Sequence, residues 1–240
     1  MATQVLTKTE PFTGFPPGGF DFFLELSHRQ SREWFKANKQ RYEELWANPF
    51  RALLDELAER MGDVLPDMTL APRHVFRIQR DTRFSPDKSP YKTHIAGHVT
   101  AYSRGEADWS VPGMYIHFGL DDSVAAVGQW GMDKDQLQLF RQAVDNERSG
   151  AALQKLVTKL KADGFSLSSH EGLKRVPPPF PQDHERGELL KMKGLSVSVV
   201  NLPEELMPSH DLADWLSERL RQAAPVAKWL HENVKAGPKG

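Results

Sequence analysis

Residues 114–124 decide the fold, and they read Met114-Tyr115-Ile116-His117-Phe118-Gly119-Leu120-Asp121-Asp122-Ser123-Val124. Every second residue from Met114 to Leu120 is apolar, whereas Tyr115 and His117 lie between them, which is the pattern of a strand with one buried face. Asp121-Asp122 then predicts a hairpin turn into a second strand that continues to residue 130. Such a hairpin predicts an antiparallel sheet with one core face and one polar face.

Strand-like alternation continues on both sides of this hairpin. Residues 93–102 place Ile95 and Val99 on one face, and His94, His98 and Tyr102 on the other. Residues 74–78 alternate in the same way, and residues 195–200 form a short apolar run that predicts a buried strand. The sequence therefore predicts a central antiparallel sheet of about four to six strands.

Helical periodicity fills the region before the sheet. Phe20, Phe23 and Leu24 have the spacing of one helix face, and the period resumes on a second helix from residue 34 to residue 46. Asn48-Pro49 predicts the N-cap and first residue of a third helix. The N-terminal part of the chain is therefore predicted to be helical.

Helices are also predicted after the sheet. Asp133 with Gln136 predicts a capping box at the start of one helix. The last helices are predicted to begin at Asp211, with Pro225 ending one and starting the next. These elements predict an α+β fold in one domain over residues 11–235, with disordered tails at 1–10 and 236–240.

Bulk composition narrows the classes of function. The 240 residues are 39% hydrophobic and 26% charged, with a formal net charge of −1, which is typical of a soluble globular protein without a global field for nucleic acid. Cysteine is absent, which excludes disulfides and cysteine-ligated zinc and agrees with a cytoplasmic location. No signal peptide and no membrane span are predicted, and the oligomeric state is left open.

The most polar segment covers residues 77–93 and contains five cationic side chains against two aspartates. Its candidate binding residues are Arg77, Arg80, Asp81, Arg83, Asp87, Lys88, Tyr91 and Lys92. Guanidinium and ammonium groups held together bind phosphate or carboxylate, and the prolines give this loop a defined shape. The alternative is a structural network in which the aspartates pair with the cations and hold the loop together.

Asp183-His184 is the candidate for acid–base catalysis, because an aspartate orients a histidine that transfers protons. Asp183 is equally suited to be a helix N-cap. Lys191 and Lys193 follow closely and are candidates for the same anion site, or ordinary solvated lysines.

Other motifs give little support for a known chemistry. His74, His94 and His117 are the histidines that neighbouring strands bring closest, but no His-Glu-x-x-His occurs and no metal is predicted. The aromatic pair Trp34-Phe35 is either a stacking platform or part of the core. There is no P-loop and no dinucleotide fingerprint, so no cofactor is identified.

The loop also carries a resemblance. Residues 80–93, Arg-Asp-x-Arg-Phe-Ser-x-Asp-Lys-Ser-Pro-Tyr-Lys-Thr, resemble the signature of domain of unknown function family 2461, a set of conserved hypothetical proteins. Residues 20–35, 179–184 and 189–193 resemble further segments of that family. The sequence departs from the pattern at Glu185, where proline is expected, and before Arg32, where asparagines are expected. The resemblance implies kinship and no activity.

Two functional hypotheses follow. The first is a protein with a pocket for a small anionic ligand, a phosphate or a carboxylate, with the option of transferase or hydrolase chemistry. The second is a non-catalytic interaction module that binds a nucleic-acid backbone or an acidic protein surface through exposed cations. The near-zero net charge favours the first hypothesis.

Overall fold

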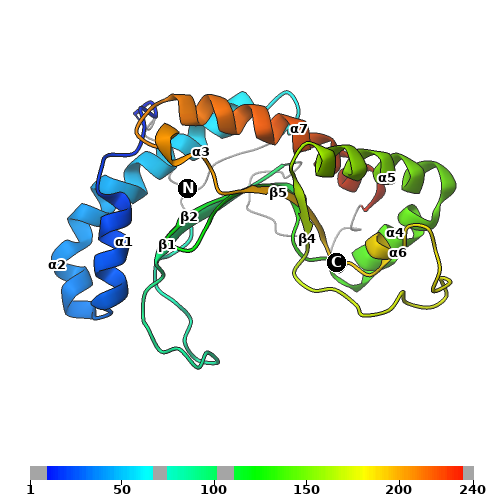
Figure 1. Ribbon diagram of the computed structural model, residues 1–240, viewed down its shortest axis with the longest axis horizontal. Helices are drawn as coiled ribbons and strands as arrows, with labels where there is room; N and C mark the ends of the chain where they lie inside the picture. Colours follow the sequence, from blue (N-terminus) through cyan, green and yellow to red (C-terminus); the bar gives the residue numbers. More distant parts are fainter. Residues whose placement is uncertain (1–9, 67–74, 102–110, 235–240) are drawn as a thin grey trace, which may run out of the picture.

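The computed structural model describes residues 10–66, 75–101 and 111–234. Its helices are α1 (Gly19–His28), α2 (Arg32–Tyr42), a π-helical turn (Glu43–Ala47), α3 (Asn48–Arg60), α4 (Lys134–Asp145), α5 (Glu147–Ala162), α6 (Gly187–Leu190), a 3-10 turn (Glu204–Leu206) and α7 (Asp211–Asn233). Its strands are β1 (His94–Thr100), β2 (Gly113–Gly119), β3 (Ser123–Gln129), β4 (Ser166–Ser168) and β5 (Leu195–Val200). The protein therefore has the predicted α+β fold, with helices at both ends and an antiparallel sheet between them (Figure 1).

The sheet has five strands in the order β1-β2-β3-β5-β4, and every neighbouring pair is antiparallel. The predicted hairpin joins β2 to β3, with Ile116 opposite Ala125. The predicted strand at 74–78 is wrong. His74 lies outside the described residues, and Val75 and Gln79 form only isolated bridges to Gly97 and Tyr91. The fifth strand is instead the short β4, whose sequence Ser-Leu-Ser gives almost no periodic signal.

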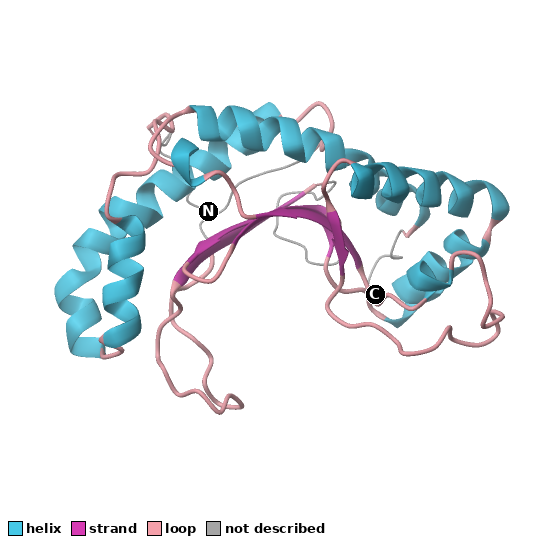
Figure 2. Cartoon of the chain, viewed as in Figure 1, coloured by secondary structure: helices cyan, strands magenta, loops and turns pink. Residues whose placement is uncertain are grey.

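The two faces of the sheet differ in what covers them. The core face carries apolar side chains such as Ile95, Met114, Ile116 and Val197, all buried. Helices α3 and α7 pack over this face, as Figure 1 shows. Figure 2 shows that the opposite face is concave and that no helix of the described chain covers it. We call this second surface the open face.

Aromatic side chains pack the N-terminal helices together. Phe23 stacks on Trp46 with ring centroids 4.7 Å apart, and Trp46 Nε1 donates a hydrogen bond to the Gly19 carbonyl at 2.8 Å. The predicted stripe of α1 is wrong in one member. Leu24 is 51% exposed, because the buried side of the helix is formed by residues one and two positions away from it, at Phe22, Phe23 and Leu26.

Helix α3 does not begin at a new N-cap. Asn48 has helical backbone angles, φ −70° and ψ −53°, so the predicted cap at Asn48-Pro49 is wrong. A proline clashes with the carbonyl four residues before it in a regular α-helix. Here the chain passes from α2 through the wider π-helical turn into α3, and the turn ends just before this proline.

Helix α7 runs unbroken through Pro225, so the predicted break at this residue is also wrong. Pro225 is exposed, whereas Ala223, Ala224 and Val226 beside it are buried. The carbonyl that the proline leaves without a partner therefore faces the solvent side. Packing of the apolar stripe against the sheet keeps the helix continuous across the proline.

Candidate functional site

The open face holds a cavity of about 760 Å³. Its lining comes from the five strands, from the segments before β1 and β2 and from the residues after β3 and β4: Phe76, His98, Val111, Gly113, Tyr115, Val124, Ala126, Gly128, Gln129, Trp130, Gly131, Ser168, His170, Ser196, Ser198 and Val200. Volumes of about 300–1,000 Å³ are typical of sites for small organic ligands. The open face is therefore a candidate ligand site.

Small side chains form the floor of this cavity. Strand register aligns Ala126 with Ser198, and Gly128 with Ser196, across β3 and β5. Gly128 has φ +145°, and a Cβ there would lie 2.2 Å from the Leu195 carbonyl oxygen, so this position requires glycine. A ligand on this floor would lie close to the sheet backbone.

Aromatic rings stand at both ends of the floor. Phe76 and Tyr115 lie at one end, with ring centroids 6.2 Å apart. Trp130 and His170 lie at the other, with centroids 6.4 Å apart, and Trp130 is 55% exposed. Aromatic walls of this kind make favourable contacts with flat or apolar groups of a ligand.

A polar network on β2 reaches the cavity at Tyr115. The Tyr115 hydroxyl lies 3.2 Å from His117 Nδ1, and His117 Nε2 lies 3.5 Å from an Asp122 carboxylate oxygen. Tyr115 and His117 share a face because they are two residues apart on one strand, and the hairpin turn places Asp122 beside them. We call Tyr115, His117 and Asp122 the hydroxyl–imidazole relay.

His94 packs against this relay. The rings of His94 and His117 have centroids 4.4 Å apart across β1 and β2. Gly119, opposite His94, makes room for them, since a Cβ there would lie 2.7 Å from the Cβ of His94 and 2.8 Å from His117 Nε2. Burial, followed by the neighbouring His117 and Lys92, lowers the pKa of His94 to about 4. His94 is therefore neutral at pH 7.

The same surroundings set the charge of the other groups. Burial lowers the pKa of His117, with Asp122 acting against that effect. Burial, followed by the Asp122 charge, raises the pKa of Tyr115 to about 12, so its hydroxyl keeps its proton at pH 7. Burial also lowers the pKa of Lys92, helped by the positive charge of Arg77.

Lys92 is not one of the residues that line the cavity, but it contacts one of them. Its ammonium lies 5.7 Å from the centroid of the Phe76 ring, which lines the cavity. The base of the loop is held by backbone hydrogen bonds from Lys92 to the Ile78 carbonyl and from Arg80 to the Pro90 carbonyl. Neither Arg77 nor Lys92 meets a carboxylate within the described part of the chain.

The cations further along the loop have partners inside it. Arg80 pairs with Asp87, Arg83 with Asp81 at 2.7 Å, and Lys88 donates to the Thr82 carbonyl at 2.9 Å. Hydrogen bonds from Arg80 and from Ser89 hold the pKa of Asp87 well below its usual range. The outer part of the loop, residues 80–88, is therefore paired internally, whereas Arg77 and Lys92 at its base form no ion pair with a carboxylate of the described residues.

Neither Tyr91 nor Arg77 lines the open-face cavity. The buried Tyr91 ring stacks on Phe35 with centroids 4.4 Å apart, so its ring belongs to the core. Arg77 lines a separate cavity of about 190 Å³, together with Lys39 and Arg51 from the N-terminal helices. Trp34 packs on Phe22 at 5.6 Å between centroids, and Phe35 is buried.

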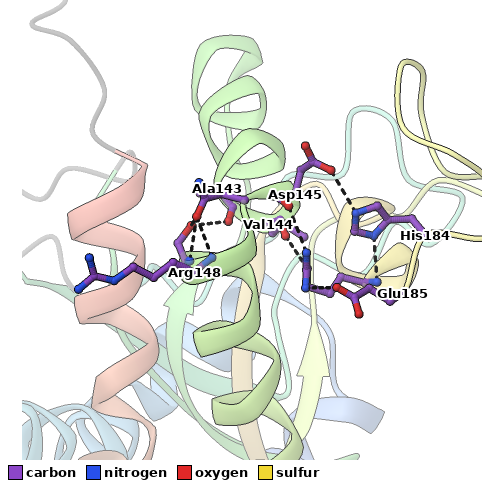
Figure 3. A network of polar contacts seen from close by, with 9 residues as sticks. Ala143, Val144, Asp145, Arg148, His184 and Glu185 are labelled. Atoms are coloured by element: carbon purple, nitrogen blue, oxygen red, sulfur yellow. Dashed lines mark hydrogen bonds and ion pairs between the residues drawn. The ribbon is translucent and has the colours of Figure 1, made fainter.

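The predicted Asp183-His184 site lies far from the loop, since Figure 1 places α6 and the basic loop at opposite ends of the molecule. His184 Nε2 contacts Asp145 at 3.1 Å, and its Nδ1 accepts the backbone N–H of Arg186 at 2.9 Å (Figure 3). Asp183 itself is exposed, and α6 begins only at Gly187, so Asp183 does not cap it.

Arg186 completes this contact region. Its side chain is buried and donates to the Val144 carbonyl at 2.7 Å and to the Asp145 carbonyl at 3.1 Å, while also contacting Glu185. We call His184 and Arg186, with the end of α4 that they hold, the α4 bracket (Figure 3). Lys191 pairs with Glu188, and Lys193 with Glu171, each at 2.5 Å.

No group of three or more metal-ligating side chains occurs in residues 10–66, 75–101 and 111–234. His74 of the possible histidine trio lies outside these ranges. Sequence reasoning placed Tyr115 and His117 on one polar face but assigned Asp121-Asp122 only to a turn. The signal for the relay was the short distance along the chain between that face and the turn carboxylates.

The fold and the cavity define an α+β protein with helices on one face of an antiparallel sheet and a ligand-sized cavity on the other. The chain belongs to the family described as Conserved hypothetical protein (DUF2461), which it matches over residues 19–229. Searches of curated proteins and of solved structures gave no match. Among the described residues, no helix has the length and apolar character needed to cross a bilayer.

Proposed function

We propose that the protein binds a small organic anion in the open-face cavity. The observation that carries this proposal is that a ligand-sized, mostly apolar cavity has a half-buried ammonium, that of Lys92, beside its aromatic wall at Phe76. Within the described residues this ammonium forms no ion pair. The floor and walls suit an apolar or flat ligand body, and Lys92 suits a carboxylate or phosphate attached to it.

Electrostatics support an anion at this end of the cavity. Burial and the charge of Arg77 both disfavour the charged form of Lys92, as its lowered pKa indicates. A bound anion would offset this repulsion and favour the ammonium form. In this proposal Lys92 at the base of the loop binds the anion and Arg77 adds positive charge near it, whereas Arg80, Arg83 and Lys88 are paired within the loop.

The alternative interaction module needs cations that are available to an extended polyanion. Arg80, Arg83 and Lys88 are already occupied by Asp87, Asp81 and the Thr82 carbonyl. Exchanging these contacts for phosphates would gain less than binding by free cations.

The test is a thermal-shift comparison of three probes of similar size: benzoate, phenyl phosphate and uncharged benzyl alcohol. We expect the two anions to raise the melting temperature more than the alcohol does. Lys92→Ala should abolish this preference for charge, whereas Ala126→Phe, which fills the floor, should abolish the shift for all three probes. Lys88→Ala is the matched control and should behave as the unmodified protein.

The outcomes separate the alternatives. Equal shifts for the anions and the alcohol would contradict anion binding at Lys92. Shifts that survive Ala126→Phe would place binding elsewhere in the molecule. Binding of a nucleic-acid duplex that weakens steeply with salt and depends on Arg83 and Lys88 would support the interaction module instead.

A further inference from the structure

The hydroxyl–imidazole relay reaches the cavity through one of its residues. Tyr115 is the one member of the relay that lines the cavity, and within the described residues its hydroxyl makes a single hydrogen bond, to His117. The second nitrogen of His117 faces the Asp122 carboxylate. The Tyr115 hydroxyl, the His117 imidazole and the Asp122 carboxylate thus form a chain of contacts that begins at the cavity and ends at a half-exposed side chain.

We propose that Tyr115 and His117 act together as a general base that takes a proton from a hydroxyl group of the bound ligand. This inference rests on the proposed function, because it needs a ligand in the open-face cavity. It adds the chemical class of the ligand: a small organic anion that also carries an ionisable hydroxyl. Tyr115 is the catalytic residue that touches the ligand, and Asp122 is a positioning residue.

Each proton in this transfer has a donor and an acceptor. The ligand O–H bond breaks and its proton moves to the Tyr115 oxygen, while the Tyr115 proton moves to His117 Nδ1. The electron pair stays on the ligand oxygen, and His117 becomes an imidazolium that faces Asp122 at 3.5 Å. Tyr115 begins and ends as a neutral phenol, so no tyrosinate accumulates.

The groups around His117 leave its imidazole neutral, and the two aspartates of the turn offset part of the cost of charging it. The imidazole begins neutral, because burial lowers its pKa, and it can therefore accept a proton. Its charged neighbours are Asp122 and Asp121 from the turn, which favour the imidazolium, and Lys92, which disfavours it. His94 on β1 is itself neutral and adds no opposing charge at pH 7.

Comparison with His184 shows what the relay has in addition. His184 also contacts an aspartate, but its Nδ1 is already occupied by a backbone N–H. A backbone N–H does not pass its proton on, so His184 has no nitrogen through which it could exchange a proton with a ligand. In the relay, the group on Nδ1 is a hydroxyl, which can pass a proton on.

The experiment uses para-nitrophenol, whose phenolate absorbs visible light, and para-nitroanisole, which has the same shape and no acidic proton. We expect both to bind. Bound para-nitrophenol should ionise about 1–3 pH units below the free phenol, because the imidazolium it creates stabilises the phenolate. Nitrogen-15 NMR of labelled histidine should show His117 becoming an imidazolium only when para-nitrophenol binds.

Variants distinguish the relay from the cavity. Tyr115→Phe keeps the ring and His117→Gln keeps a polar side chain, and each should lose the phenolate band while still binding para-nitroanisole. His184→Gln is the matched control and should keep the band. Failure of both probes to bind would overturn the proposed cavity and this inference with it. Binding of both probes with para-nitrophenol still protonated, or a band that survives His117→Gln, would overturn the relay alone.

Discussion

Two histidine–aspartate contacts in this protein have similar lengths but different surroundings. His184 reaches Asp145 at the end of α4, and its other nitrogen is held by the Arg186 backbone. His117 reaches Asp122 in a hairpin turn, and its other nitrogen contacts a hydroxyl that lines a cavity. The His184 contacts only hold two segments of the chain together, whereas the His117 contacts connect to a hydroxyl group in the cavity. What lies on the second nitrogen, more than the aspartate, indicates whether such a pair can do chemistry.

The largest expected effect comes from breaking the α4 bracket. Arg186→Ala should lower the free energy of unfolding by about 3 kcal/mol, because a buried guanidinium is lost and the Val144 and Asp145 carbonyls lose a charged donor. Urea denaturation measures this change. Arg148→Ala, whose side chain points away from the bracket in Figure 3, is the control and should be nearly neutral. A loss of probe binding without a loss of stability would show that the bracket serves the site directly.

Breaking the relay through its glycine should cost less stability and more function. In Gly119→Ala the new methyl group would lie 2.8 Å from His117 Nε2, so we expect the ring to move away from its place beside Asp122. The cost in unfolding free energy should be about 1–3 kcal/mol, typical of an overpacked site. The phenolate band of bound para-nitrophenol should disappear while para-nitroanisole still binds. A variant that keeps the band would contradict the role given to this contact.

Lowering the pH should change the stability of the protein through His94, the neutral histidine beside His117. His94 has a pKa of about 4 in the folded protein against an ordinary value of 6.5. Between these two pH values the unfolded chain binds more protons at His94 than the folded protein does. His94 therefore lowers the stability of the folded state as the pH falls from 6.5 towards 4, and it has no such effect above pH 6.5. The melting temperature of His94→Gln should therefore fall less over this range than that of the unmodified protein. Parallel curves would contradict this assignment.

The smallest effect is expected in the outer part of the loop. Arg83 is highly exposed and pairs with Asp81 in solvent. Exposed pairs of this kind contribute little, so Arg83→Ala should leave both the melting temperature and benzoate binding unchanged. Lys92→Ala in the same assay supplies the contrast. A clear loss of benzoate binding in Arg83→Ala would return the ligand site to the outer loop.

Some features that depend on neighbouring residues were predicted correctly, whereas features that depend on residues far apart in the chain were not. The capping box of Asp133 and Gln136 and the hairpin at Asp121-Asp122 depend on neighbouring residues, and the structure confirms both. The break at Pro225 was wrongly predicted because packing against the sheet keeps α7 continuous. Asp145 lies 39 residues from His184, and no local pattern could have paired them. The open-face cavity was beyond prediction for the same reason, since its floor joins strands far apart in the chain.

The two faces of the sheet separate the residues that stabilise the fold from the residues that shape the open-face cavity. Ala126, Ser196 and Ser198 each carry few atoms towards the open face, while their neighbours Val127 and Val197 anchor the strands under α7. Enlarging one of the small residues would make the open-face cavity shallower by about a methyl group and leave the helical side undisturbed. If the cavity binds a ligand as we propose, a single replacement on this surface would change which ligands fit, without compensating changes in the hydrophobic interior.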